Sequence, residues 1–187
     1  MDAFSYLSVL LSIILGLAIT QVLQGVRALM LARARVRAFL PTLIWAGMVL
    51  LMATQSWWAS FGLVRHEHWT FAEFAVVLLQ MVLLYMLAGL VLPDLPADAP
   101  VDLESHYWRE ARPLFGLLLA ILAVSLGKDW LIDGHLPGPA NVAFHVSFAT
   151  VAVVGITSRR SWVHHALALL ALAMMALYIA ALFTRLT

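Results

Sequence analysis

The sequence predicts an all-α, polytopic membrane protein built as a bundle of six transmembrane helices. Of its 187 residues, 64% are hydrophobic and only 11% are charged, which is more apolar surface than a soluble domain of this size can bury. The apolar residues fall into six runs, each near the roughly 20 residues that a helix needs to cross a bilayer. This composition excludes a water-soluble enzyme, a secreted disulfide scaffold and a disordered tail. We expect one transmembrane helical domain over residues 1–187.

The six runs predict the helices in chain order. They are Phe4–Gln24, Pro41–Leu63, Phe71–Leu92, Pro113–Asp133, Pro139–Thr157 and Trp162–Thr184. Pro41, Pro113 and Pro139 each stand where the first turn of a helix tolerates proline, and Gly134 follows the fourth run as a C-terminal glycine does. Each proline and the glycine therefore marks the expected boundary of a helix.

Two connecting segments are longer than a simple turn. Residues 25–40 are basic, and they predict either a short amphipathic helix on anionic lipid or a continuation of the first helix into the cytoplasm. Residues 93–112 predict a proline-broken acidic strip that ends in an interfacial turn. Asp94, Asp98 and Asp102 are four residues apart, but the prolines between them prevent a helix that would align them. We therefore expect these carboxylates to be solvated.

The basic residues predict the orientation. The chain has ten arginines and one lysine, a bias typical of GC-rich bacterial genes, so we expect a bacterial inner (cytoplasmic) membrane. Most of the arginines follow the first, third and fifth helices: Arg27, Arg33, Arg35, Arg37, Arg109, Arg112, Arg159 and Arg160. Because cytoplasmic loops are enriched in basic residues, this distribution predicts that the N-terminus and the C-terminus are both periplasmic.

Small residues form a stripe along the first helix. Ser8, Ser12, Gly16 and Thr20 recur every four residues, and such spacing lets another helix approach closely. The stripe predicts helix packing, either inside the protomer or between the protomers of a homo-oligomer. The alternative is that it forms the wall of a conduction path.

Polar residues inside the predicted helices indicate a binding site, since lipid makes them costly unless they face the protein interior or a cavity. Gln55, Gln80, Lys128, Asp129 and His145 are such residues. Because most of them lie toward the predicted periplasmic ends of their helices, they predict a ligand or ion pocket that opens to the periplasm.

Each of these residues also has a structural interpretation. The glutamines are suited to hydrogen bonds between helices, and His145 to a neutral core histidine with Asn141 as its partner. A cation such as Lys128 is favoured near a helix C-terminus by the helix dipole. Asp129 is unfavourable there unless it is paired or hydrated, so it is the stronger candidate for a functional role.

Other motifs are weaker. Thr70 and Glu73 have the spacing of a capping box, which gives Glu73 a structural role. His66 and His68 offer two imidazoles in a loop, and the sequence leaves open whether they bind a metal. We find no nucleophile elbow, phosphate-binding loop or zinc-protease motif. We therefore expect no catalytic residue, no cofactor and no nucleic-acid partner.

The segments FSYLSVLLSIILGLAITQVLQG and QSWWASFG carry a resemblance. Through them the chain resembles a group of bacterial six-helix inner-membrane proteins of about this length. The resemblance implies the membrane but neither an activity nor a functional residue. From the residues themselves we expect a protein that binds or passes a small solute or ion through the polar pocket. The alternative is a non-transporting accessory, assembly or sensor subunit that docks a partner through the first helix.

Overall fold

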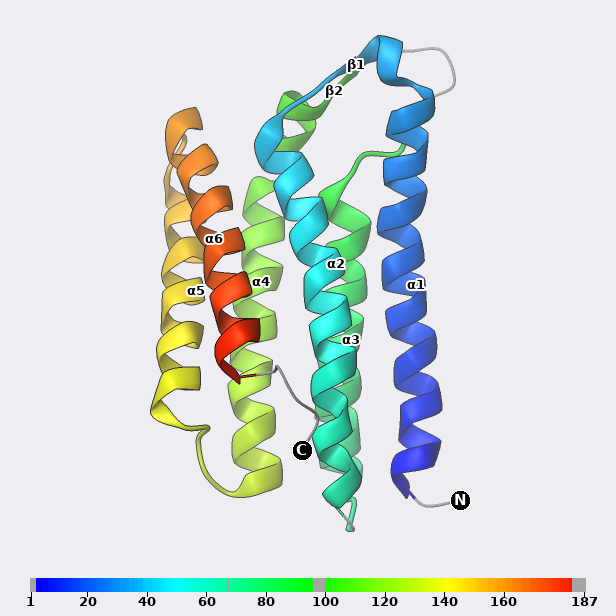
Figure 1. Ribbon diagram of the computed structural model, residues 1–187, viewed down its shortest axis with the longest axis vertical. Coiled ribbons are helices and arrows are strands. Elements are labelled where there is room, and N and C mark those ends of the chain that lie inside the picture. Colours follow the sequence, from blue (N-terminus) through cyan, green and yellow to red (C-terminus); the bar gives the residue numbers. More distant parts are fainter. Residues whose placement is uncertain (1–2, 67, 96–99, 183–187) are drawn as a thin grey trace.

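The computed structural model describes residues 3–66, 68–95 and 100–182 of the chain. Within them six helices run alternately up and down (Figure 1). They are α1 (Ala3–Leu31), α2 (Leu40–Ser60), α3 (Phe71–Val91), α4 (Leu103–Asp133), α5 (Pro139–Thr157) and α6 (Ser161–Leu182). Short elements lie between them: the 3-10 turns η1 (Arg33–Arg35) and η2 (Phe61–Arg65), and the strands β1 (Val36–Arg37) and β2 (Val101–Asp102).

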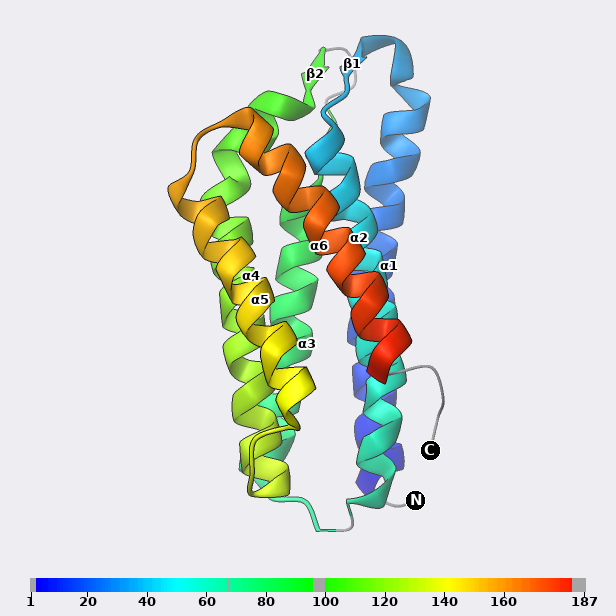
Figure 2. The same cartoon turned by 60° about the vertical axis from the view of Figure 1, so that its left-hand side comes forward.

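The connections gather at two opposite ends of the bundle. The links from α1 to α2, from α3 to α4 and from α5 to α6 lie at one end, and the links from α2 to α3 and from α4 to α5 lie at the other (Figures 1 and 2). We call the first the arginine end, because it carries the eight arginines that follow the first, third and fifth predicted helices. We call the second the cavity end, because the cavity described below lies there.

All six helices are long and apolar enough to cross a membrane. Their outward faces remain apolar, as the exposed side chains of Ile13, Val146, Leu170 and Leu177 show. Exposed apolar side chains in such number are unfavourable in water but are solvated by lipid. The fold is therefore that of a multi-pass membrane protein.

The helices pack around one shared core. α1 packs against α2 and α3, α4 packs against α3 and α5, and α6 packs against α2 and α5. The buried face of α1 consists of large apolar residues at helical spacing, among them Leu7, Leu11, Leu15 and Val22. At Gly155, α5 approaches α4 so closely that an added Cβ would lie 2.5 Å from the ring of Phe115.

The first helix is longer than the run that predicts it. α1 continues to Leu31, so the first residues of the segment 25–40 continue the first helix, and η1 and β1 follow. The cytoplasmic location of this continuation stays a prediction. At about 1.5 Å per residue its 29 residues extend about 43 Å, compared with roughly 30 Å for the hydrocarbon core of a bilayer. α1 is therefore longer than the hydrocarbon core is thick.

The predicted start of the fourth helix at Pro113 is wrong. α4 begins at Leu103, and Pro113 lies inside it, so the turn expected at the end of residues 93–112 is helical. Asp102 starts the helix, because its carboxylate accepts hydrogen bonds from the N–H groups of Glu104 and Ser105. Pro113 is exposed on the helix surface, where the missing N–H does not leave a buried group unpaired.

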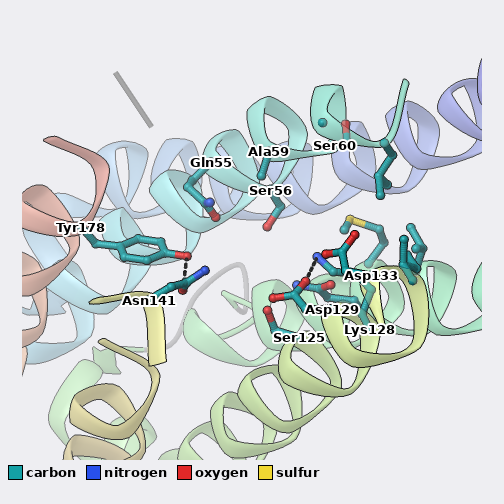
Figure 3. A pocket seen from close by; sticks show the side chains of 16 residues that line it. Gln55, Ser56, Ala59, Ser60, Ser125, Lys128, Asp129, Asp133, Asn141 and Tyr178 are labelled. Atoms are coloured by element: carbon teal, nitrogen blue, oxygen red, sulfur yellow. Dashed lines mark hydrogen bonds and ion pairs between the residues drawn. The ribbon is translucent and has the colours of Figure 1, made fainter. Parts of the chain in front are cut away.

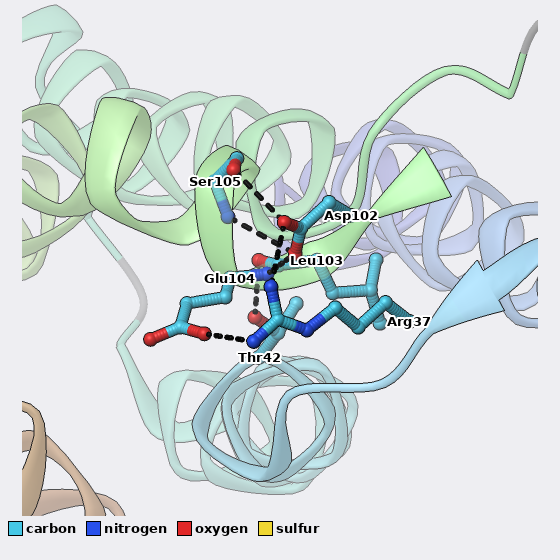
Figure 4. A network of polar contacts seen from close by, with 6 residues as sticks. All are labelled: Arg37, Thr42, Asp102, Leu103, Glu104 and Ser105. Carbon is cyan, nitrogen blue, oxygen red and sulfur yellow. Dashed lines mark hydrogen bonds and ion pairs between the residues drawn. The ribbon is translucent and has the colours of Figure 1, made fainter. Parts of the chain in front are cut away.

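A pair of short strands ties α1 and α2 to α4 at the arginine end. β1 and β2 are parallel, with Val36 opposite Val101 and Arg37 opposite Asp102. The Arg37 guanidinium lies 3.3 Å from the Asp102 carboxylate and 3.4 Å from that of Glu104 (Figure 4). Asp102 is thus both a helix cap and an ion-pair partner, and not only a solvated carboxylate. Asp98 of the same predicted strip lies outside the described residues.

The other helix boundaries agree with the sequence to within a few residues. Pro41 stands at the first turn of α2 and Pro139 begins α5. Gly134 ends α4 in the left-handed conformation with φ of 74°, which glycine adopts without steric cost. Thr70 and Glu73 form the predicted capping box at the start of α3. The predicted end of the last helix, Thr184, lies outside the described residues.

Candidate functional site

A cavity of about 270 Å³ lies between α2, α3 and α4 at the cavity end. Across it, polar side chains of α2 face polar side chains of α4 (Figure 3). These residues are spaced by helical periods, which is why one face of each helix lines the cavity. From α2 they are Gln55, Ser56 and Ser60, and from α4 they are Ser125, Lys128, Asp129 and Asp133.

The cavity contains an ion pair in its wall. Nζ of Lys128 lies 3.4 Å from Oδ1 of Asp129, and the side chains are 20% and 19% exposed. Adjacent residues on a helix point in different directions, so this contact is long and leaves most hydrogen-bonding positions of both groups free for water or a ligand. Asp129 is therefore paired and partly exposed to the cavity, as expected of a carboxylate at this depth.

Gln80 brings an unpartnered polar group to the cavity from α3. Its side chain is 9% exposed, and its Oε1 has no hydrogen-bond partner in the described part of the chain. A buried amide oxygen without a donor costs about 1–3 kcal/mol. The helix-bridging role considered for Gln80 is thus not satisfied at Oε1 by a donor in the described part of the chain, and Gln80 lines the cavity with this oxygen turned into its wall.

The fifth predicted pocket residue, His145, lines a second and narrower cavity of about 70 Å³. Nδ1 of His145 donates to the backbone oxygen of Asn141 at 2.9 Å, and its Nε2 lies 3.2 Å from Oγ of Ser125. Asn141 is thus the hydrogen-bond partner that was predicted for His145, and the bond is to its backbone oxygen and not to its side chain. Both ring nitrogens are satisfied in the neutral imidazole, as expected of a core histidine.

The two cavities adjoin each other. Five residues line both of them, namely Gln55, Ser56, Gln80, Ser125 and Tyr178. The hydroxyl of Tyr178 on α6 donates to Oδ1 of Asn141 on α5 at 3.2 Å, and this pair lies at one side of the wide cavity (Figure 3). All five predicted pocket residues therefore line one or the other of two adjoining cavities, while their role in ligand binding stays a prediction.

An aromatic layer lies between the cavities and the arginine end. Trp45 lines the narrow cavity and packs edge-on against Phe115, with ring centroids 5.2 Å apart. Closer to the arginine end, the Tyr107 hydroxyl donates to Nδ1 of His164 at 2.8 Å, and Nε2 of His164 donates to the Ser158 oxygen at 3.2 Å. Trp45, Phe115 and His164 are at most 1% exposed, so this layer closes the cavities toward the arginine end.

The small-residue stripe faces outward. Ser12, Gly16 and Thr20 are exposed, and nothing lies within 4 Å of a Cβ added to Gly16. Its hydrogen bond to a neighbouring helix of the protomer runs 3.4 Å from Nε1 of Trp57 to Oγ of Ser12, and Oγ of Ser8 donates to the Ser5 oxygen within α1 at 3.0 Å. The buried face of α1 is its large apolar face. Packing through the stripe, inside the protomer or between protomers, therefore stays a prediction.

The histidines of the loop between α2 and α3 have structural contacts. Nε2 of His66 lies 3.5 Å from the Glu73 carboxylate, and the indole N–H of Trp69 donates to the His66 oxygen at 3.0 Å. His68 is exposed, and the intervening Glu67 lies outside the described residues. Among the described residues no group of three or more potential ligands is arranged to hold a metal ion.

Several lining residues were not predicted from the sequence, among them Ser125, Asn141 and Tyr178. Ser125 precedes Lys128 and Asp129 by three and four residues, so helical spacing alone places this serine beside predicted residues. Tyr178 carries no comparable signal, since the sequence between His165 and Thr184 contains no other polar residue.

The comparisons with known proteins add no relationship. No protein-family model, no curated protein and no solved structure matches the chain. The class that the fold defines, a multi-pass membrane protein with a polar cavity at one end, therefore stands on the chain's own residues.

Proposed function

We propose that the protein binds a small solute or ion in the wide cavity, from the periplasmic side of a bacterial inner membrane. One observation carries the proposal: the half-buried Lys128–Asp129 ion pair lies in the wall of a polar cavity, and Gln80, whose Oε1 has no donor in the described part of the chain, lines the same cavity. Buried polar groups in membrane proteins usually have partners, and unsatisfied ones that line a cavity are typical of a binding site.

The orientation rests on the separation of charge. Eight arginines lie at the arginine end, whereas Arg65 and Lys128 are the basic residues of the described chain at the cavity end. Basic loops remain cytoplasmic during insertion. The cavity then opens toward the periplasm, and both chain termini lie on that side.

Binding is favoured over an open pore. The buried aromatic layer around Trp45, Phe115 and His164 fills the bundle on the cytoplasmic side of the cavities. Passage of a solute would require this layer to move, whereas binding requires only access from the cavity end. A carrier that alternates between two states and a receptor subunit both begin with this binding step.

The test is solute binding by the purified protein in lipid nanodiscs. We would record the melting temperature with amino acids, amines, carboxylates, sugars and alkali ions at millimolar concentration. A ligand is expected to raise the melting temperature, and Asp129→Asn is expected to abolish the shift. Asp94→Asn, an exposed carboxylate near the opposite end, is the matched control and should leave it intact. A panel in which no solute stabilises the protein contradicts the proposal.

A second candidate function is supported by the outward stripe on α1. A lipid-exposed face of small residues is favoured where another helix packs closely, so α1 is suited to dock a second protomer or a different membrane protein. In that case the protein is an accessory, assembly or sensor subunit. It would then show no solute dependence, and replacement of the stripe by large residues would remove its partner.

A further inference from the structure

The linings of the two adjoining cavities restrict the ligand further, and this inference rests on the proposed function. The wide cavity has polar walls, while the narrow one is lined mainly by apolar side chains, among them Trp45, Met52, Phe144 and Phe148. A charged group is excluded from such apolar surroundings by the cost of desolvation. The ligand that fills both must therefore have a polar end and an apolar end.

The polar end of the ligand faces charges of both signs in the wide cavity. Lys128 and Asp129 lie side by side in the wall, and the exposed Asp133 lies at the same cavity. An ammonium pairs with a carboxylate and a carboxylate with an ammonium, so one ligand that carries both groups satisfies the pair without leaving a charge uncompensated. Gln80 lines the cavity beside this polar end.

The apolar end is small. The narrow cavity of about 70 Å³ is roughly half of the ~150 Å³ that accommodates benzene in an engineered protein cavity. It therefore accepts a short alkyl group but not an aromatic ring. The methionines Met48, Met52 and Met175 line it, and their flexible thioethers adapt to branched alkyl groups.

From these features we infer that the ligand is a small zwitterion with a short aliphatic side chain, of the class of the aliphatic amino acids. Its ammonium and carboxylate bind Asp129 and Lys128 in the wide cavity, and its side chain enters the narrow cavity past Gln55 and Gln80. The two halves of the ligand are thus recognised by two different sets of residues.

The experiment is competition against radiolabelled valine on the full-length protein in nanodiscs. The competitors are glycine, which lacks the side chain, isobutyrate, which lacks the ammonium, and isobutylamine, which lacks the carboxylate. We expect each to bind at least about tenfold more weakly than valine, since even one methylene in an apolar pocket is worth roughly 10–200-fold. Lysine, with a charged side chain, is expected not to compete.

A variant separates the two halves of the site. Leu122 lines the narrow cavity and is half-buried, so Leu122→Phe fills the space with limited disturbance. It should remove the advantage of valine over glycine and leave glycine binding unchanged. Leu119→Phe, also half-buried on α4 but not among the residues lining either cavity, is the control and should keep the valine preference.

The outcomes distinguish this inference from the proposed function. If glycine, isobutylamine or isobutyrate binds as tightly as valine and the binding depends on Asp129, the solute site stands and the zwitterion with an alkyl tail is overturned. If no probe binds, and the wider solute panel also fails to stabilise the protein, the proposed function is overturned together with it.

Discussion

The hydroxyl of Tyr107 on α4 donates a 2.8 Å hydrogen bond to Nδ1 of His164 on α6, and the side chain of His164 is completely buried. Because Nε2 of the same ring donates to the Ser158 oxygen, the neutral imidazole is fully hydrogen-bonded. This pair fixes α6 against α4 at the arginine end, in the layer that closes the cavities.

Tyr107→Phe is expected to destabilise the protein by about 1–3 kcal/mol, since it leaves a buried ring nitrogen without a donor while it preserves the shape of the side chain. The measurement is denaturant unfolding in mixed micelles. Tyr85→Phe is the control, because Tyr85 is 41% exposed, and its effect should be within about 0.5 kcal/mol. Equal effects of the two substitutions would contradict the proposed role of the pair.

Two glycines make a matched test of the contact between α5 and α4. In Gly155→Ala the new Cβ would meet the ring of Phe115, and such overpacking costs about 1–3 kcal/mol. In Gly89→Ala the Cβ enters open space, so the higher helix propensity of alanine is expected to stabilise by up to about 1 kcal/mol. Changes of the same sign in the free energy of unfolding would show that the helices are not in contact at Gly155.

Asp102 makes the stability of the arginine end depend on pH. Partial desolvation raises the pKa of its carboxyl, but hydrogen bonds from Glu104 and Ser105 and the charge of Arg37 outweigh it, so the pKa lies below its ordinary value of 3.8. The native state therefore binds fewer protons than the unfolded state in this range. The resulting stability is present above pH 3.8 and is lost as the pH falls through the lower pKa of the folded protein.

Asp102→Asn tests this pH dependence, because asparagine also caps helices but cannot ionise. The melting temperature of the natural protein is expected to fall more steeply between pH 5 and pH 2 than that of the variant. Parallel curves for the two proteins would mean that the carboxylate does not contribute through its charge.

The small-residue stripe on α1 predicts that a large side chain introduced into it prevents assembly with a partner helix. Gly16→Leu adds a large side chain where the protomer has open space, so the protomer should fold normally while a close contact with another helix is blocked. Native mass spectrometry from nanodiscs is expected to show a loss of the second copy or of a co-purifying protein. Leu17→Ala, at an exposed position beside the stripe, should retain it. An unchanged assembly state for Gly16→Leu removes the stripe from the interface.

The fold was largely predictable from the sequence because the energy of burying apolar residues in lipid dominates it. The six apolar runs matched six helices, but the start of α4 was misplaced at Pro113. Proline is only preferred at a first turn, and an exposed proline inside a long helix is tolerated when other contacts hold the helix. Asp102, the actual cap, was assigned to a solvated strip because its partner Arg37 is distant in the sequence.

The candidate site was predictable only in part. Hydropathy identifies Gln55, Gln80 and Asp129 as costly to place in lipid. The sequence alone therefore predicts that they face the interior of the bundle. Periodicity does not determine which helices neighbour each other, so the pairing of His145 with Ser125 and the contribution of Tyr178 required the tertiary structure. For the same reason the stripe on α1 predicted a close contact between helices but not which helix makes that contact.

The most direct test of a cavity open to the periplasm is the labelling of one introduced thiol. The chain has no cysteine, so Ser56→Cys in the wide cavity is the only target for a charged, membrane-impermeant thiol reagent. In spheroplasts we predict reaction from outside, slowed by a bound solute, whereas Ser105→Cys at the arginine end reacts only after the membrane is permeabilised. The contrary result is that Ser105→Cys reacts in intact spheroplasts, while Ser56→Cys reacts only after permeabilisation or not at all. That result would show that the cavity does not open to the periplasm.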